Sequence, residues 1–219
     1  MAGEDSTTKK KTTGHMAEYV HEGTVIIRVG PEGVPYHVHK ALLRHHSEYF
    51  TRALNGNWKE AEENLITLDD VDCSTFDTFV HWIYTQRRPE RYTDWAGDHP
   101  SGVSKRLRAF EMGLAFETGL ALEMGLVEAC VFADRFVVPA FGRMVAHLFL
   151  HYLVTEAAAA VEVVAYAYEH LPEGHPVLEA MMDSYCSLIW DDDSGDLSHY
   201  HYQILPQRFQ DTLEAKLGL

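Results

Sequence analysis

Three short segments with the composition of β-strands constrain the fold of this chain more than any other feature. Thr24–Val29 is rich in β-branched residues, the turn cluster Pro31-Glu32-Gly33 follows it, and Tyr36–His39 has the composition of a second strand. Leu65–Leu68 has the composition of a third. The chain is therefore expected to form one small sheet of short strands in its first half.

Two apolar stripes at helical spacing alternate with these strands. The first covers residues 42–54, predicts a single helix, and ends at Asn55-Gly56. The second covers residues 76–84 and follows Asp72 and Ser74, both of which are capping candidates. This alternation predicts a mixed α and β unit.

A repeat of six residues interrupts the pattern further along the chain. Residues 86–108 contain Pro and Gly at short intervals and predict a loop or insertion. Residues 109–126 then read AFEMGL, AFETGL, ALEMGL. Six residues advance a helix by about 240° beyond a full turn, so the repeated leucines diverge, and each mid-helix glycine costs about 1 kcal/mol relative to alanine. Two interpretations remain, a loosely held and partly helical insertion or a dedicated partner-binding device.

The chain after the repeat is predicted to be helical. Residues 127–137 are largely apolar, and Pro139 is suited to the first turn of the helix that residues 141–153 predict. Thr155 is a candidate cap for a helix over residues 161–168, and residues 177–189 predict one more.

Both ends of the chain are polar. Residues 1–22 lack apolar periodicity and predict a disordered tail, although the Lys9-Lys10-Lys11 triplet could also serve nuclear import. Residues 191–219 form an acidic tail with a short helical candidate near Phe209 and Leu213. Neither end shows a long apolar face, so both are expected to be dispensable for folding.

Composition narrows the classes of partner. The 219 residues carry a net charge of −15, and the residues after 108 hold seventeen acidic side chains but only four basic ones. Nucleic acids and anionic membranes attract Lys and Arg, so neither is an expected ligand, and no apolar stretch is long enough to span a bilayer. The three cysteines are far apart, which predicts reduced thiols and a cytoplasmic or nuclear protein.

Motifs for catalysis, cofactors and metals are absent from the sequence. His147 and His151 have the spacing of two zinc ligands, but the residues between them include no Glu and no third ligand is evident. The acidic run at 191–196 does not match the spacing of a calcium-binding loop. No Gly-rich phosphate loop or nucleophile elbow occurs. We therefore expect no enzyme, no cofactor and no metal site.

Residues 35–85 resemble the BTB/POZ domain, in particular the BTB proteins of filamentous fungi. The matching residues are spaced along the predicted strands and helices: His39, Lys40, Leu43, Ser47, Phe50, Leu65–Leu68, Phe76, Phe79, Ile83, Tyr84 and Thr85. Residues 131–136 and 161–174 resemble the helical continuation in the same fungal group, so the resemblance covers roughly residues 24–190.

The resemblance implies an α+β architecture, a three-stranded sheet capped by a helical cluster and followed by an all-helical extension. Its expected parts are listed in chain order: the tail 1–22, the BTB/POZ core 23–90, the loop and hexapeptide insertion 91–126, the helical continuation 127–190 and the acidic tail 191–219.

The resemblance also implies function, namely homo- or hetero-oligomerisation and the docking of other proteins. Some BTB proteins recruit the cullin-3 ubiquitin ligase scaffold through a hydrophobic-x-Glu motif, which falls here on Trp58-Lys59-Glu60. An exposed Trp58 could bury a large area in a partner, with Glu60 supplying orientation, but Trp58 could equally pack within its own chain. A cullin-3 adaptor and an oligomerisation scaffold or transcriptional co-regulator remain alternatives. Direct DNA contact would have to use the basic residues of the loop 87–108.

Overall fold

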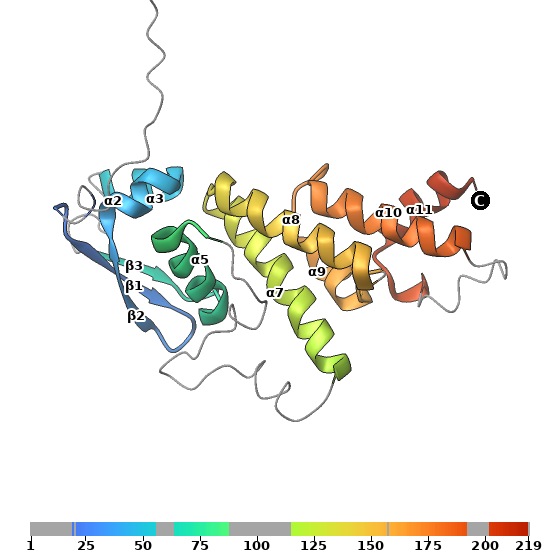
Figure 1. Ribbon diagram of the computed structural model, residues 1–219, viewed down its shortest axis with the longest axis horizontal. Coiled ribbons are helices and arrows are strands. Elements are labelled where there is room, and N and C mark those ends of the chain that lie inside the picture. The colour runs from blue at the N-terminus through green and yellow to red at the C-terminus, as the bar shows by residue number, and fades with distance from the viewer. Residues whose placement is uncertain are drawn as a thin grey trace, which may run out of the picture.

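The molecule is elongated, with a small sheet at one end and a carboxy-terminal helix at the other (Figure 1). This computed structural model describes residues 19, 21–55, 64–87, 115–156, 158–191 and 202–218. The expected tail 1–22 and the loop 86–108 therefore lie largely outside the described residues, as do the first repeat copy and the acidic run at 192–200. Within the described part, no helix is both long enough and apolar enough to cross a membrane.

The sheet confirms the three predicted strands. Strands β1 (Thr24–Val29), β2 (Val34–His39) and β3 (Leu65–Leu68) lie in the order β2-β1-β3. β1 pairs antiparallel with β2 and parallel with β3. Alternate β1 side chains are buried against the helices, which is the period-two pattern of a sheet covered on one face.

The helix predicted over residues 42–54 is wrong, because two helices occupy this range. α2 (Lys40–His46) ends at Ser47, whose backbone is extended, and α3 (Glu48–Asn55) starts directly after it. The Ser47 hydroxyl accepts a hydrogen bond from the Phe50 N–H at 3.1 Å and donates one to the Phe136 carbonyl oxygen at 2.6 Å. Ser47 therefore caps α3. Its second hydrogen bond links the break between α2 and α3 to Phe136.

Helices α5 (Cys73–Thr85), α7 (Ala115–Arg135) and α8 (Pro139–Glu156) follow the sheet unit. Asp72 caps α5 as predicted, since its carboxylate accepts the Ser74 N–H. α7 packs against both α5 and α8, so the sheet unit and the helical extension share one hydrophobic core (Figure 1).

Helices α9 (Val161–His170), α10 (Pro176–Asp191) and α11 (Gln207–Leu217) complete the chain, with a short 3-10 turn, η3 (Tyr202–Ile204), before α11. The cap assigned to Thr155 is wrong, because Thr155 lies inside α8 and Ala160 precedes α9. The backbone N–H of Ala160 donates instead to the buried carboxylate of Glu123, 2.7 Å away. The Glu123 side chain, from another helix, therefore satisfies the backbone donor at the start of α9.

The second and third repeat copies form the amino-terminal half of α7, so the boundary expected at 126/127 falls inside a continuous helix. The third copy is not loosely held, because Leu126 and Glu123 are buried. Glu123 accepts hydrogen bonds from Ala160 and from the Tyr152 hydroxyl at 2.8 Å. Packing against α8 and α9 offsets the cost of the helix glycines.

Deleting residues 115–120 should nevertheless change the free energy of unfolding by less than about 1 kcal/mol. The first copy then occupies the vacated positions, with Glu third and Leu sixth as before, and the third copy stays in place. Deleting only 118–120 is the matched control, because it puts Phe116 at the position of Gly119, where an added Cβ would lie 3.6 Å from the Tyr152 hydroxyl oxygen. Urea unfolding of both variants measures the difference, and a loss of several kcal/mol in the six-residue deletion would contradict the prediction.

The premise that the acidic tail has no apolar face is wrong for residues 202–217, although its dispensability for folding stays a prediction. α11 packs against α10, and its Phe209 and Leu213 side chains are fully buried. Two apolar residues four apart are a weak signal in a polar segment, and only the packed structure shows that the rest of the fold covers them.

Candidate protein-docking surface

Helix α3 presents an exposed face next to the sheet unit. Tyr49 is 38% exposed although its ring lies edge-on to the rings of Phe50 and Phe136, at centroid distances of 5.2 and 4.9 Å. Glu48 and Arg52 flank it and form an exposed ion pair one turn apart. Packing on buried rings holds Tyr49 in place while its outer edge remains open to solvent.

The turn between α7 and α8 supplies the second part of this surface. The Val138 N–H donates to the Ala133 carbonyl and the Val137 N–H to the Asp134 carbonyl, which is the Schellman ending of a helix. Val137 has a φ of 50°, a left-handed conformation that is unfavourable for a β-branched residue, and is 43% exposed. The chain therefore presents an isopropyl group to solvent at a position that glycine would fill with less strain.

Charged side chains border these apolar residues. Arg135 forms an ion pair with Asp70, and its guanidinium carbon lies 5.0 Å from the centroid of the Phe136 ring. The hydrogen bond from Arg135 lowers the pKa of the Asp70 carboxyl. We call these residues the α3 surface. Its apolar members are Tyr49 and Val137, and its charged border consists of Glu48, Arg52, Asp70 and Arg135. An apolar centre with a polar rim is the usual anatomy of a protein interface.

Trp58, Lys59 and Glu60 lie outside the described residues, so the structure does not place them. Their segment lies between Asn55, where α3 ends, and Asn64, whose backbone carbonyl accepts a hydrogen bond from the Ile26 N–H at 3.0 Å just before β3. The α3 surface itself was missed by the sequence analysis. Tyr49 sat in the apolar stripe assigned to a buried helix face, and nothing in the sequence signals a left-handed valine.

Strand addition at the free edge of β2 is disfavoured by the backbone. The Ile26 N–H points to β3, so its partner His37 and the neighbours Pro35 and His39 direct their backbone groups outward. Pro35 has no N–H, and the His39 N–H donates to the Tyr84 hydroxyl at 3.2 Å. At the β2 edge, docking through helix and turn side chains is therefore favoured over β-augmentation.

The described part of the chain gives little indication of metal binding or of a reactive thiol. No group of three or more possible metal ligands occurs there, and His147 and His151 stand on α8 without such a cluster. Cys73, Cys130 and Cys186 are free thiols, and burial raises the pKa of Cys130 to about 12. A buried neutral thiol is a poor nucleophile.

Replacing Val137 with glycine should raise the free energy of unfolding by about 1 kcal/mol, because glycine adopts the left-handed conformation without strain. Thermal unfolding followed by circular dichroism measures the change. Val138→Gly is the control and should destabilise, since Val138 is fully buried. Destabilisation by Val137→Gly would show that the exposed side chain contributes to folding.

Residues 18–94 match the family model of the BTB/POZ domain. No curated protein matches the chain.

Proposed function

Because the chain contains a BTB/POZ domain over residues 18–94 and is thus a protein-protein interaction module, we propose that the α3 surface and Trp58-Lys59-Glu60 together dock a partner protein. The observation that carries this proposal is the exposed, strained Val137, which directly follows Phe136, together with Tyr49, which is 38% exposed and packs edge-on against the Phe136 ring. Strain is maintained at functional sites more often than elsewhere.

We further propose that the partner is the cullin-3 scaffold and that the chain acts as an adaptor in the cytoplasm or nucleus. Trp58 follows Asn55 by three positions, so their Cα atoms can lie at most about 11 Å apart. The motif is therefore tethered within reach of Tyr49, two turns back on α3. In this proposal the Trp58 indole is the apolar anchor for the partner and Glu60 supplies orientation, as the motif implies.

Replacing Trp58 with alanine should weaken binding of the amino-terminal domain of the host's cullin-3 by about thirtyfold, or about 2 kcal/mol, because a desolvated aromatic anchor is lost. Titration calorimetry measures the affinity, and circular dichroism checks folding. His81→Ala, at an exposed position of α5 outside the proposed docking site, is the control and should change affinity little.

Two outcomes would redirect the proposal. Equal binding by wild type and Trp58→Ala would mean that cullin-3 uses another surface. No binding by wild type would eliminate the adaptor role and leave the alternative of an oligomerisation scaffold or co-regulator. Light scattering then tests that alternative, because a scaffold should be oligomeric and should dissociate when its contact surface is mutated.

A further inference from the structure

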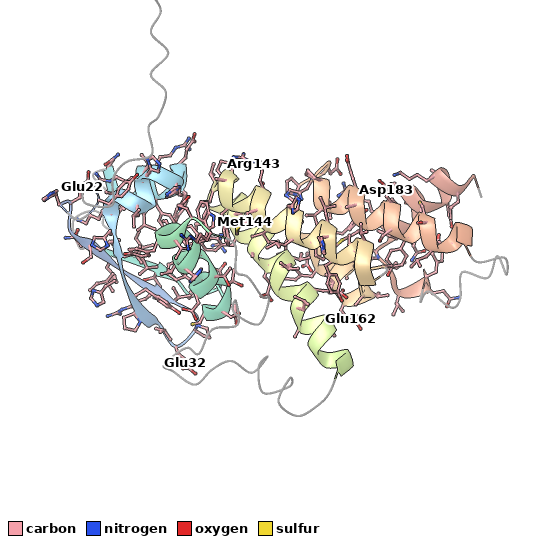
Figure 2. All side chains as sticks on the ribbon, viewed as in Figure 1. Glu22, Glu32, Arg143, Met144, Glu162 and Asp183 are labelled. Carbon is pink, nitrogen blue, oxygen red and sulfur yellow. The ribbon has the colours of Figure 1, made fainter. Side chains whose placement is uncertain are left out.

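The imidazole of His175 closes the amino-terminal end of α10, which lies between the labelled Arg143 and Asp183 in Figure 2. The Val177 N–H donates to its Nδ1 at 3.3 Å, and the His175 carbonyl accepts from the Leu178 N–H at 2.9 Å. His175 is therefore the N-cap of α10, where a side-chain acceptor satisfies one of the free N–H groups at the start of a helix. Because the donor is a backbone N–H, Nδ1 must carry a lone pair, so this cap requires the neutral imidazole.

The backbone on both sides of His175 is fixed. Its N–H donates to the Pro172 carbonyl at 3.1 Å, across a turn in which Gly174 has a φ of 75°. Pro176 follows at the first position of α10, where its ring fixes its own φ. The side-chain torsions are thus the part of His175 that can respond to a change of charge.

The elements around this turn carry further charged or titratable side chains, namely Asp134 of α7, His147 of α8, His170 of α9, Glu173 of the turn itself, Glu179 of α10 and Arg208 of α11. Glu173 and Arg208 form an ion pair at 3.1 Å. Asp134 is the group whose charge raises the pKa of His175. Its carboxylate is therefore the anionic acceptor that a protonated His175 ring would meet.

The folded chain favours the neutral, capping ring. Burial lowers the pKa of the His175 imidazole below its ordinary value of 6.5 and outweighs the opposite effect of Asp134. The helix dipole also opposes a cation at the start of α10. The stability that the cap contributes is therefore present above pH 6.5 and is lost as the pH falls through the lowered pKa.

We propose that His175 is a pH-operated cap: its neutral ring holds the first turn of α10 closed, and protonation opens that turn and redirects the ring to Asp134. The Asp134 carbonyl also accepts the Val137 N–H at 3.1 Å, so Asp134 belongs to the turn that presents Val137. Acidification thereby brings a positive charge next to the α3 surface. The device stands on the geometry of the cap and does not depend on the cullin-3 proposal.

Nuclear magnetic resonance of the full chain between about pH 8 and about pH 5 tests the proposal, because this range spans the ordinary histidine pKa. The ring carbons of His175 report its protonation, and the amide proton of Val177 reports the cap. We expect the Val177 amide proton to move upfield with the same midpoint as the ring, at a pH below 6.5. His175→Asn should hold this signal constant, since the Asn oxygen caps without titrating. His147→Asn, at an exposed position of α8, is the matched control and should respond as wild type.

Two further measurements can overturn the proposal. Asp134→Asn should lower the midpoint of the His175 titration further, and an unchanged or higher midpoint would overturn the assignment of Asp134. In urea, the unfolding constant of wild type divided by that of His175→Asn should rise about fivefold on acidification, the effect of losing a typical N-cap. A constant ratio, or a Val177 amide that does not follow the His175 ring in wild type, would overturn the cap. The wild-type titration decides this even if a variant does not fold.

Discussion

We expect Phe79→Ala to lower the free energy of unfolding by about 3–5 kcal/mol, the cost of a large cavity in a packed aromatic core. Phe79 is fully buried on α5 and lies at the centre of a cluster of rings. Its ring neighbours are Phe50 of α3, Phe76 and Trp82 of α5, Phe132 of α7 and Phe141 of α8.

The same substitution tests whether the sheet unit and the helical extension unfold together. Because Phe79 contacts rings from α3, α7 and α8, the single thermal transition should move down by roughly 10 °C without splitting. Differential scanning calorimetry measures this, and His81→Ala, at an exposed position of α5, is the matched control. Two separate transitions in the variant would show that the extension folds independently of the BTB/POZ domain.

The second large effect is expected at Glu123, a carboxylate that is 6% exposed. Glu123→Ala should lower the free energy of unfolding by about 3 kcal/mol, because the Tyr152 hydroxyl and the Ala160 N–H both lose their acceptor. Glu123→Gln is the control and should cost much less. Its amide oxygen can accept from Ala160 while its NH₂ group donates to the Tyr152 oxygen. Urea unfolding compares the three proteins, and equal losses in both variants would contradict this account.

Glu123 should also make stability depend on pH. Burial raises the pKa of its carboxyl above the ordinary value of 4.5, which outweighs the two hydrogen bonds that favour the charged form. The folded chain then binds a proton more tightly than the unfolded chain. Stability from this group is therefore present below pH 4.5 and is lost as the pH rises through the raised pKa.

The comparison with Glu123→Gln isolates this contribution, because Gln does not titrate. The free energy of unfolding of wild type, minus that of the Gln variant, should fall as the pH rises from below 4.5 and then level off above the raised pKa. Denaturant unfolding at a series of pH values measures the difference. A difference that rises with pH would mean that the charged form is favoured by folding and that its hydrogen bonds outweigh its burial.

Local sequence determined the parts of the fold that depend on periodicity. The β-branched run at residues 24–29 and the stripe at 76–84 predicted β1 and α5, because burial on one face imposes a spacing that is visible along the chain. The Asp72 cap could also be predicted from the sequence, since its carboxylate accepts from an N–H only two residues away. The resemblance at residues 35–85 then indicated the BTB/POZ domain that the family model confirms.

Tertiary structure decided the features that depend on partners distant in sequence. Ser47 breaks a helical stripe because it reaches the carbonyl of Phe136, 89 residues away, and Glu123 makes the repeat part of the core because it reaches Ala160. Burial of Phe209 depends on Tyr168 and Tyr185, and exposure of Val137 depends on how α7 meets α8. A one-dimensional pattern records which residues are apolar or polar, whereas packing decides which of them another helix covers and which remain on the surface to bind a partner.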